Sequence, residues 1–454
     1  MFSEKYRKIE QRSIFVSLLL LFLMQGFAQT SVFVSSSATD DTGDGTTWET
    51  AKKTIAAGIT AAGTDGTVCV KAGSYVVSAQ LNIPIGVRVQ GGYRQSSTGT
   101  DTTQRRLPGV NSHWTDNAWC TIISGKEYGI ASYRIATVHG LLEGCVIRAG
   151  SVQDYGGGVL IDGEGATVRY CVVKECEAIN DYENNAEGGG VYIRNNGTLI
   201  NSVVTECRAD NGVGVAGEDG YLINNTITRN YPSHCGYVVD VDGNYYNTVL
   251  IGTQCWMKEN LRTTHYPDSA AIIHLTGGSS STYGAYYKNA NLSDAYAQYG
   301  LLYNWLAVMH GASSSDAVPS GRQGICPNGW HVPSNAEWTL MENFLKSQRR
   351  YWCNNNSNYI GKSLAAKTGW NGANDCSVGS TPSTNNATRF SALPAGRYID
   401  NSYSNLGLEA LFWTATQNND NTAYMRYLNS GNASLLSNSY NKSNAYSVRC
   451  VKNN

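Results

Sequence analysis

Short apolar runs separated by glycine-rich and polar stretches dominate the first half of the chain. One unit of this pattern begins at Cys145 and returns at Cys171, at Val203 and, in part, at Ile227. Units open with a β-branched strand, continue with a glycine cluster such as Gly156–Gly158 and end in a second strand. Unequal polar loops absorb the differences in length. Such a repeat predicts short strands stacked in successive coils, as in a right-handed parallel β-helix.

The start of this half predicts a cap and the first strands. The segment TAKKTIAAGITAA at 50–62 predicts an amphipathic helix with Ile55 and Ile59 one turn apart. Strand patterns follow at 67–77 and 81–93. A β-sandwich is the alternative, but it requires regular hairpins, whereas the loops here are unequal. The order of "DGTTWETAKKTI" and "GTVCVKAGSYVV" resembles that of pectate-lyase-like β-helix proteins of bacterial surfaces.

The pattern changes at residue 237. Residues 237–251 place apolar strands on either side of Asp242-Gly243, which predicts a hairpin. Further on, Ser334 and Glu337 have the spacing of a capping box, and the apolar positions that follow predict a helix at about 335–346. A second short helix is expected to end near Gly369.

A series of motifs then runs in order to the end of the chain. It comprises GTQCWMKENLRTTHY (252–266), YGLLYNW (299–305), GICPNGWHVPSNAEWTLMENFL (324–345), FSALPAGRY (390–398), FWTATQ (412–417) and AYSVRCV (445–451). This series closely resembles the FISUMP, or major paralogous, domain of secreted bacterial proteins. "GWHVPSNAEW" and "SVRCV" also resemble the C-type-lectin-like fold. The expected fold is therefore mainly β, with a right-handed parallel β-helix at 30–235 followed by an α+β C-type-lectin-like FISUMP domain at 238–453.

The N-terminus and the composition indicate an exported protein. Residues 1–28 read as a signal peptide, because basic residues precede the apolar run Ile14–Met24 and Gly-Phe-Ala ends at Ala28. No other long apolar run exists, so no transmembrane segment is expected in the mature chain. The 34 Lys and Arg residues nearly balance the 35 Asp and Glu residues, which argues against a nucleic-acid partner. Localisation outside the cell or at its surface follows; the oligomeric state is left open.

Twelve cysteines in an exported chain can form disulfides. The FISUMP resemblance implies a bridge between Cys326 and Cys450, and Cys353 and Cys376 flank a loop that a second bridge would close. Cys255 is either free or paired with Cys235.

In the coils, Cys145 is expected to stack on Cys171, and Cys176 on Cys207. We interpret these cysteines as buried thiols, with stacked disulfides as the alternative.

Polysaccharide lyases of the β-helix fold need clustered carboxylates and a base, and the charged residues of the coils are the candidates for such a catalytic set. The candidates are the acidic residues and arginines of the repeats: Asp154, Asp162, Glu164, Glu175, Asp181, Glu183, Glu187, Glu206, Arg148, Arg169 and Arg194. Catalysis would require Glu175, Glu187 and Glu206 to meet in one groove; otherwise these are charges of the outer face. No cofactor or metal is predicted. Asp40, Asp41 and Asp44 could hold a structural cation, but their spacing is not that of an EF-hand.

The favoured function is non-catalytic binding or adhesion, with a polysaccharide or surface glycoprotein as partner. Aromatic rings in loops suit sugar faces. The candidate ligand-binding residues are the loop aromatics Trp352, Tyr359, Tyr398, Tyr403 and Tyr424. Two alternatives stay open: a polysaccharide-active enzyme with its site on the β-helix, and a purely structural envelope protein, which predicts no cluster of aromatics in a concave surface.

Overall fold

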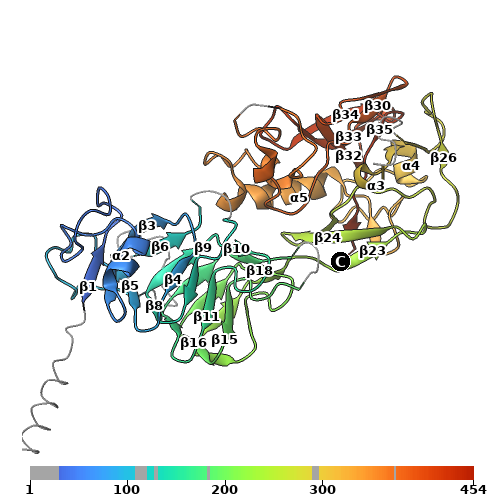
Figure 1. Ribbon diagram of the computed structural model, residues 1–454. Coiled ribbons are helices and arrows are strands. Elements are labelled where there is room, and N and C mark those ends of the chain that lie inside the picture. Colours follow the sequence, from blue (N-terminus) through green and yellow to red (C-terminus); the bar gives the residue numbers. More distant parts are fainter. Residues whose placement is uncertain are drawn as a thin grey trace, which may run out of the picture.

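The computed structural model describes residues 30–107, 120–126, 131–180, 185–288, 296–372 and 375–453. The predicted signal peptide at 1–28 lies outside this part. The fold is mainly β, with few and short helices, as predicted. In the described ranges no helix is both long and apolar enough to cross a membrane. Figure 1 shows two parts side by side, an N-terminal part with the low strand numbers and a C-terminal part that begins at β23.

Four parallel sheets build the N-terminal part. The chain passes through the sheets in turn, so that successive coils place neighbouring strands in the same sheet. The first sheet contains β1 (Ser31–Val34), β2 (Thr67–Lys71), β5 (Arg88–Tyr93), β8 (Leu141–Glu143), β12 (Thr167–Arg169), β16 (Gly197–Ile200) and β20 (Gly220–Ile223). The second contains β3 (Gly73–Val76), β6 (Thr121–Ser124), β9 (Cys145–Arg148), β13 (Val172–Lys174), β17 (Val203–Thr205) and β21 (Thr226–Thr228).

The third sheet contains β4 (Leu81–Ile83), β7 (Ala136–Val138), β11 (Val159–Asp162), β15 (Val191–Arg194) and β19 (Val215–Gly217). The fourth, which we call the junction sheet, contains β10 (Ser151–Val152), β14 (Glu177–Ala178), β18 (Arg208–Ala209) and β22 (Tyr231–Pro232). In Figure 1, β10 and β18 lie on the side nearest the C-terminal part.

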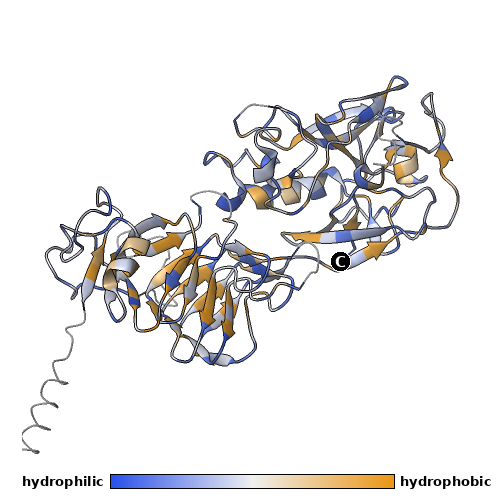
Figure 2. Cartoon of the chain, in the orientation of Figure 1, coloured by the Kyte–Doolittle hydropathy of each residue, from blue (hydrophilic) through white to orange (hydrophobic). Residues whose placement is uncertain are grey.

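Apolar ladders hold the coils together. Ala136, Val159, Val191 and Val215 are in register on successive strands, and the first three are fully buried. Figure 2 shows the hydrophobic colouring concentrated on these strands. Each inward side chain packs on the equivalent side chain of the next coil. Coils of unequal length therefore build one continuous core as long as these positions stay apolar.

The cap helix exists, but it is shorter than expected. Helix α2 (Ile55–Ala62) begins only after Thr54, whose side chain accepts a hydrogen bond from the backbone N–H of Ala57. The two predicted isoleucines, Ile55 and Ile59, are buried. The strand patterns at 67–77 and 81–93 are each divided into two strands, because the chain turns into the next sheet near Ala72 and Gly86.

Thiols rather than disulfides occupy the predicted cysteine ladders. Cys145, Cys171, Cys176 and Cys207 are buried and are not bridged. Burial raises the pKa of Cys171 to about 12, so its thiol stays protonated at neutral pH. These cysteines act as small apolar residues of the core.

Small, mostly antiparallel sheets build the C-terminal part. A five-stranded sheet contains β23 (Tyr237–Val239), β24 (Tyr245–Ile251), β25 (Gln254–Met257), β36 (Val451–Lys452) and β29 (Trp330–His331). A six-stranded sheet contains β26 (Ile273–His274), β27 (Ala285–Tyr287), β28 (Leu302–Asn304), β35 (Ala445–Tyr446), β30 (Arg397–Ile399) and β31 (Ser402–Ser404). A third contains β32 (Glu409–Gln417), β33 (Thr422–Asn429) and β34 (Leu436–Asn441).

The helices of this part are short except for α5 (Asn335–Lys346), which has the predicted bounds and capping box. The others are α3 (Tyr296–Tyr299), α4 (Trp305–Met309), the 3₁₀ turns η2 (Arg349–Tyr351) and η3 (Pro382–Thr384), and α6 (Gly361–Leu364). Helix α6 ends well before Gly369, contrary to the prediction, because the backbone N–H of Ala366 bonds to Ala392 instead of continuing the helix. The predicted hairpin forms from β23 and β24.

Three disulfides secure the C-terminal part and its connection to the coils. Cys326 bonds to Cys450 and Cys353 bonds to Cys376, as predicted. The third bridge joins Cys235 to Cys255 and resolves the pairing that the sequence left open. Such bridges are typical of proteins that fold in an oxidising environment outside the cytoplasm.

Candidate functional site

Two cavities lie where the N-terminal and C-terminal parts meet. The smaller measures about 360 Å³ and lies between the last coils and the α5–η2 segment. The larger, which we call the interdomain cleft, measures about 1100 Å³ and is lined by both parts. A cleft of this size is large enough for several sugar rings, so the junction is the candidate functional site.

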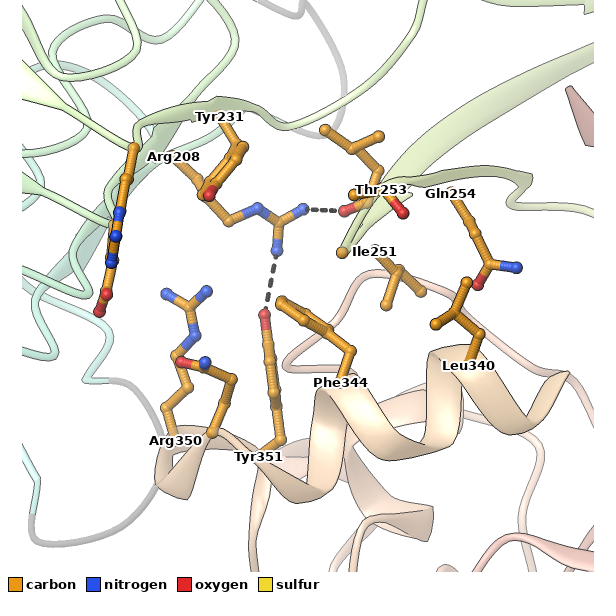
Figure 3. A pocket seen from close by; sticks show the side chains of 14 residues that line it. Arg208, Tyr231, Ile251, Thr253, Gln254, Leu340, Phe344, Arg350 and Tyr351 are labelled. Atoms are coloured by element: carbon orange, nitrogen blue, oxygen red, sulfur yellow. Dashed lines mark hydrogen bonds between the residues drawn. The ribbon is translucent and has the colours of Figure 1, made fainter. Parts of the chain in front are cut away.

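Arg208 holds the two parts together at the smaller cavity. Its side chain is 4% exposed and comes from β18 of the junction sheet. Its guanidinium donates hydrogen bonds to the carbonyl of Leu250 at 3.0 Å and to the hydroxyl of Tyr351 at 3.4 Å (Figure 3). Figure 3 also shows Phe344 and Leu340 of α5 approaching the same space. The small cavity therefore lies in the contact between the two parts, where hydrogen bonds and apolar side chains meet.

The interdomain cleft is lined by groups that suit sugar hydroxyls. Trp352 contributes an aromatic ring from the segment that follows η2, and Tyr133 contributes one from the coils. Side-chain amides of both parts also line the cleft: Gln80, Gln153, Asn354, Asn385 and Asn386. Amides both donate and accept hydrogen bonds, as hydroxyl groups require.

Local contacts fix the position of Trp352 in the cleft. The indole N–H of Trp352 donates to the carbonyl of Leu345 at 3.1 Å, near the end of α5. The adjacent residue, Cys353, is held by its disulfide to Cys376. Trp352 is half-buried, so part of its ring is accessible while the rest packs on the core. A ring held in this way loses little entropy on binding.

Of the five predicted ligand-binding aromatics, Trp352 lines the interdomain cleft, and the other four line neither cavity. Tyr359 is exposed, and the hydroxyl of Tyr424 donates to Asn418. The prediction of loop positions is wrong for three of them, because Tyr398 lies in β30, Tyr403 in β31 and Tyr424 in β33. Tyr398 is 1% exposed, and its ring centre lies 4.2 Å from that of Tyr287 and 4.7 Å from that of Tyr403. Burial therefore leaves Tyr398 no surface for a ligand.

The three glutamates considered for catalysis do not meet. Glu175 and Glu206 follow equivalent strands at the same corner of consecutive coils, whereas Glu187 lies at another corner, in register with Tyr155. Glu206 lines the small cavity, and none of the three lines the interdomain cleft. Burial by itself raises the pKa of Glu175, but the charges of Lys174 and Arg148 outweigh it and lower the net pKa. Glu175 is thus an ionised partner of these cations and lacks the raised pKa of a general acid.

Most other charged candidates of the coils form ion pairs. Arg194 contacts Asp162 at 2.8 Å, Arg169 contacts Glu143 at 3.2 Å, and Arg134 contacts Asp154 at 2.7 Å. Glu164 is exposed. The two remaining candidates, Asp181 and Glu183, lie outside the described residues.

The acidic residues near the N-terminus form loop hydrogen bonds. Asp40 accepts from Thr42, Asp41 from the backbone of Lys53 and Thr54, and Asp44 from Thr46 and Thr50. Over the described ranges, no group of three or more His, Cys, Asp or Glu side chains is arranged to hold a metal ion.

Sequence reasoning missed several residues of the cleft, above all Arg350 and Lys367. Arg349-Arg350-Tyr351-Trp352 places two cations beside two aromatic rings, and this run was the available signal. No sequence signal marked Lys126 and Tyr133, because only the folded chain brings the coils against the segment at 350–354.

Comparison with known proteins identifies the C-terminal part. Residues 249–452 match the Fibrobacter succinogenes major domain. This match confirms the predicted FISUMP resemblance and covers every strand from β25 to β36. No curated protein and no solved structure matches the chain. The major domain thus supplies one wall of the cleft, and the stacked coils supply the other.

Proposed function

We propose that this chain is a secreted, non-catalytic binding protein that takes a polysaccharide, or the glycan of a surface glycoprotein, in its interdomain cleft. The observation that carries the proposal is the cleft itself, with Trp352 and Tyr133 among amide side chains from both parts. Aromatic rings cover the apolar faces of sugars, while amides bond to their hydroxyl groups.

The proposal includes an architecture. The stacked coils serve as a right-handed parallel β-helix platform, and the major domain serves as a C-type-lectin-like module. One strand per sheet in each coil supports the first assignment. Small antiparallel sheets, loops secured by disulfides and the two-residue pairing of β29 with the terminal strand β36 support the second.

Binding is favoured over the two alternatives by specific features of the cleft. The carboxylates that line it, Asp154 and Glu177, are both engaged in ion pairs with arginines. A catalytic carboxylate pair would need one member held protonated, and no such arrangement supports an enzyme here. A purely structural protein would have no aromatic rings gathered in a concave surface, whereas Trp352 and Tyr133 line this one.

A glycan array probed with the mature chain 29–454, followed by two aromatic variants, tests the proposal. Trp352→Ala should weaken binding of the selected glycan about five- to tenfold, because one ring face is lost. Tyr359→Ala is the matched control, since Tyr359 is an exposed aromatic of the same loop outside the cleft, and it should change the affinity less than twofold. Failure of the whole chain to bind any glycan would overturn the proposal; equal effects of the two variants would move the site elsewhere.

A further inference from the structure

Positive charge is concentrated in the interdomain cleft. The chain as a whole is nearly neutral, with a formal net charge of −1. The cleft, in contrast, has two carboxylates, Asp154 and Glu177, among its lining residues. Its basic lining residues are Lys126, Arg134, Arg350, Lys362, Lys367 and Arg389. An excess of cations in one concave surface attracts anions and focuses their approach.

Ion pairs neutralise only part of this charge. Arg134 contacts Asp154 at 2.7 Å within the coils. Arg389 contacts Glu177 at 3.4 Å across the junction. These two pairs use both carboxylates that line the cleft. Four basic residues of the lining remain: Lys126, Arg350, Lys362 and Lys367.

The lysines stand on both walls. Lys126 follows β6 of the coils, and Lys367 follows α6 of the major domain; both are exposed, and neither forms an ion pair with any described residue. Lys362 lies within α6, where its ammonium donates to the carbonyl of Ser380. Burial lowers the pKa of Lys362, and the charge of Asp375 offsets this shift only in part.

Arg350 adds a buried cation with unused hydrogen-bond donors. Its side chain is 6% exposed, and its Nε and Nη1 atoms have no hydrogen-bond partner in the described part of the chain. The guanidinium lies 4.9 Å from the ring centre of Tyr351 and borders both cavities (Figure 3). The Oε2 atom of Glu177 likewise lacks a partner. Buried donors of this kind are normally paired, so Nε and Nη1 of Arg350 leave room for an acceptor oxygen of a ligand. The charges of Glu177 and Glu175 also act on this guanidinium.

We propose that the ligand of the interdomain cleft is an acidic polysaccharide, held through its carboxylate or sulfate groups by Lys126, Lys362 and Lys367. This inference rests on the proposed function and names its ligand class. Cations on both walls suit a polymer that carries charge at intervals, and the amide and aromatic lining suits its sugar rings. A nucleic acid would also be anionic, but the near-neutral charge of the whole chain disfavours it.

Matched pairs of polymers test the charge requirement. The probes are alginate against carboxyl-reduced alginate, and dextran sulfate against dextran, with poly(dT) as a further anion. Affinity electrophoresis of the mature chain should show at least tenfold tighter binding to one charged member than to its neutral counterpart at 50 mM salt, and weaker binding at 300 mM salt. Preference for alginate assigns carboxylate recognition, and preference for dextran sulfate assigns sulfate recognition.

Two double variants test the location. Lys126→Gln with Lys367→Gln should weaken binding of the selected acidic polymer about tenfold or more, because charged hydrogen bonds are lost. Arg88→Gln with Lys452→Gln removes the same charge from exposed positions outside the cleft and should have less than a twofold effect. Unchanged circular dichroism and melting temperature would show that both variants remain folded.

The remaining outcomes separate the two proposals. Equal binding of charged and neutral polymers would overturn the acidic ligand class and leave glycan binding in place. Equal weakening by the two double variants, or none, would remove the interdomain cleft as the site. Tighter binding of poly(dT) than of either acidic polysaccharide would assign the cleft to nucleic acid. Silence with every polymer, when the glycan array is positive, would overturn the acidic ligand class alone; silence on the array as well would overturn both proposals.

Discussion

Glu337 performs two tasks at the start of α5. Its Oε2 atom accepts a hydrogen bond from the backbone of Ser334, which completes the capping box, and another from Ser320. Its Oε1 atom lies 2.8 Å from Nε2 of His331, while Nδ1 of His331 lies 2.7 Å from the side-chain oxygen of Asn453. With acceptors at both ring nitrogens, the protonated imidazole is the form that fits.

His331 should make stability depend on pH. Burial by itself lowers the pKa of His331, but the hydrogen bonds to Glu337 and Asn453 and the charge of Glu337 raise it overall. A raised folded-state pKa gives stability that is complete below the unfolded value of about 6.5 and is lost as pH rises through the folded value. His331→Gln should therefore cost about 1–3 kcal/mol at pH 5.5 and less at pH 9.

Urea unfolding of both proteins at these two pH values measures the difference. Comparing the variant with the parent at each pH cancels the titration of other groups. A destabilisation that is the same at both pH values, or larger at pH 9, would contradict the assignment of a protonated His331.

At the scale of elements, glycines allow the coils to stack closely at one corner. The backbone N–H of Gly158 bonds to Gly190 of the next coil, and that of Gly190 bonds to Gly214. A Cβ atom added at Gly190 would lie 2.5 Å from a methyl group of Val204 and 2.9 Å from the carbonyl oxygen of Gly214. No side chain fits there without moving a neighbouring coil.

Gly190→Ala should destabilise the chain by about 1–3 kcal/mol through overpacking. Gly277→Ala is the control, because an added Cβ at Gly277 meets no atom within 4 Å. It should be nearly neutral. Thermal unfolding followed by circular dichroism would compare the two. Similar melting temperatures for both variants would show that the corner tolerates a methyl group.

At the scale of the whole molecule, the two parts are joined by contacts from several elements. Arg208 of the junction sheet bonds to Leu250 and Tyr351, and Arg389 pairs with Glu177. The connection also carries the Cys235–Cys255 bridge. These contacts indicate a fixed arrangement, in agreement with the short connection near 231–237.

Removing the polar contacts should loosen this arrangement. Arg208→Ala combined with Arg389→Ala should increase the radius of gyration in small-angle X-ray scattering, while each part keeps its fold. Arg88→Ala with Lys452→Ala is the control, since both side chains are exposed and neither makes any of these contacts. An unchanged scattering profile for the first variant would show that the remaining contacts and the disulfide suffice.

Much of the fold was predictable because its signals are local. The stacked strands follow from a repeat that places β-branched residues such as Val172 and Val203 at equivalent positions. The capping box of α5 lies within four residues, so its spacing alone specifies it. Errors arose where a distant partner decides the structure: Tyr398 reads as a loop residue, but it pairs with Ala445 of β35 and is buried.

The sequence by itself determined the kind of elements, the repeat of the coils, the C-terminal domain family and two of the three disulfides. Each of these follows from short-range periodicity or from motifs in a fixed order along the chain. The tertiary structure alone decided the candidate site. Lys126, Tyr133, Arg350 and Trp352 line one cleft although more than two hundred residues separate the first pair from the second. Their proximity depends on how two separately built cores pack against each other, and no local pattern encodes that packing.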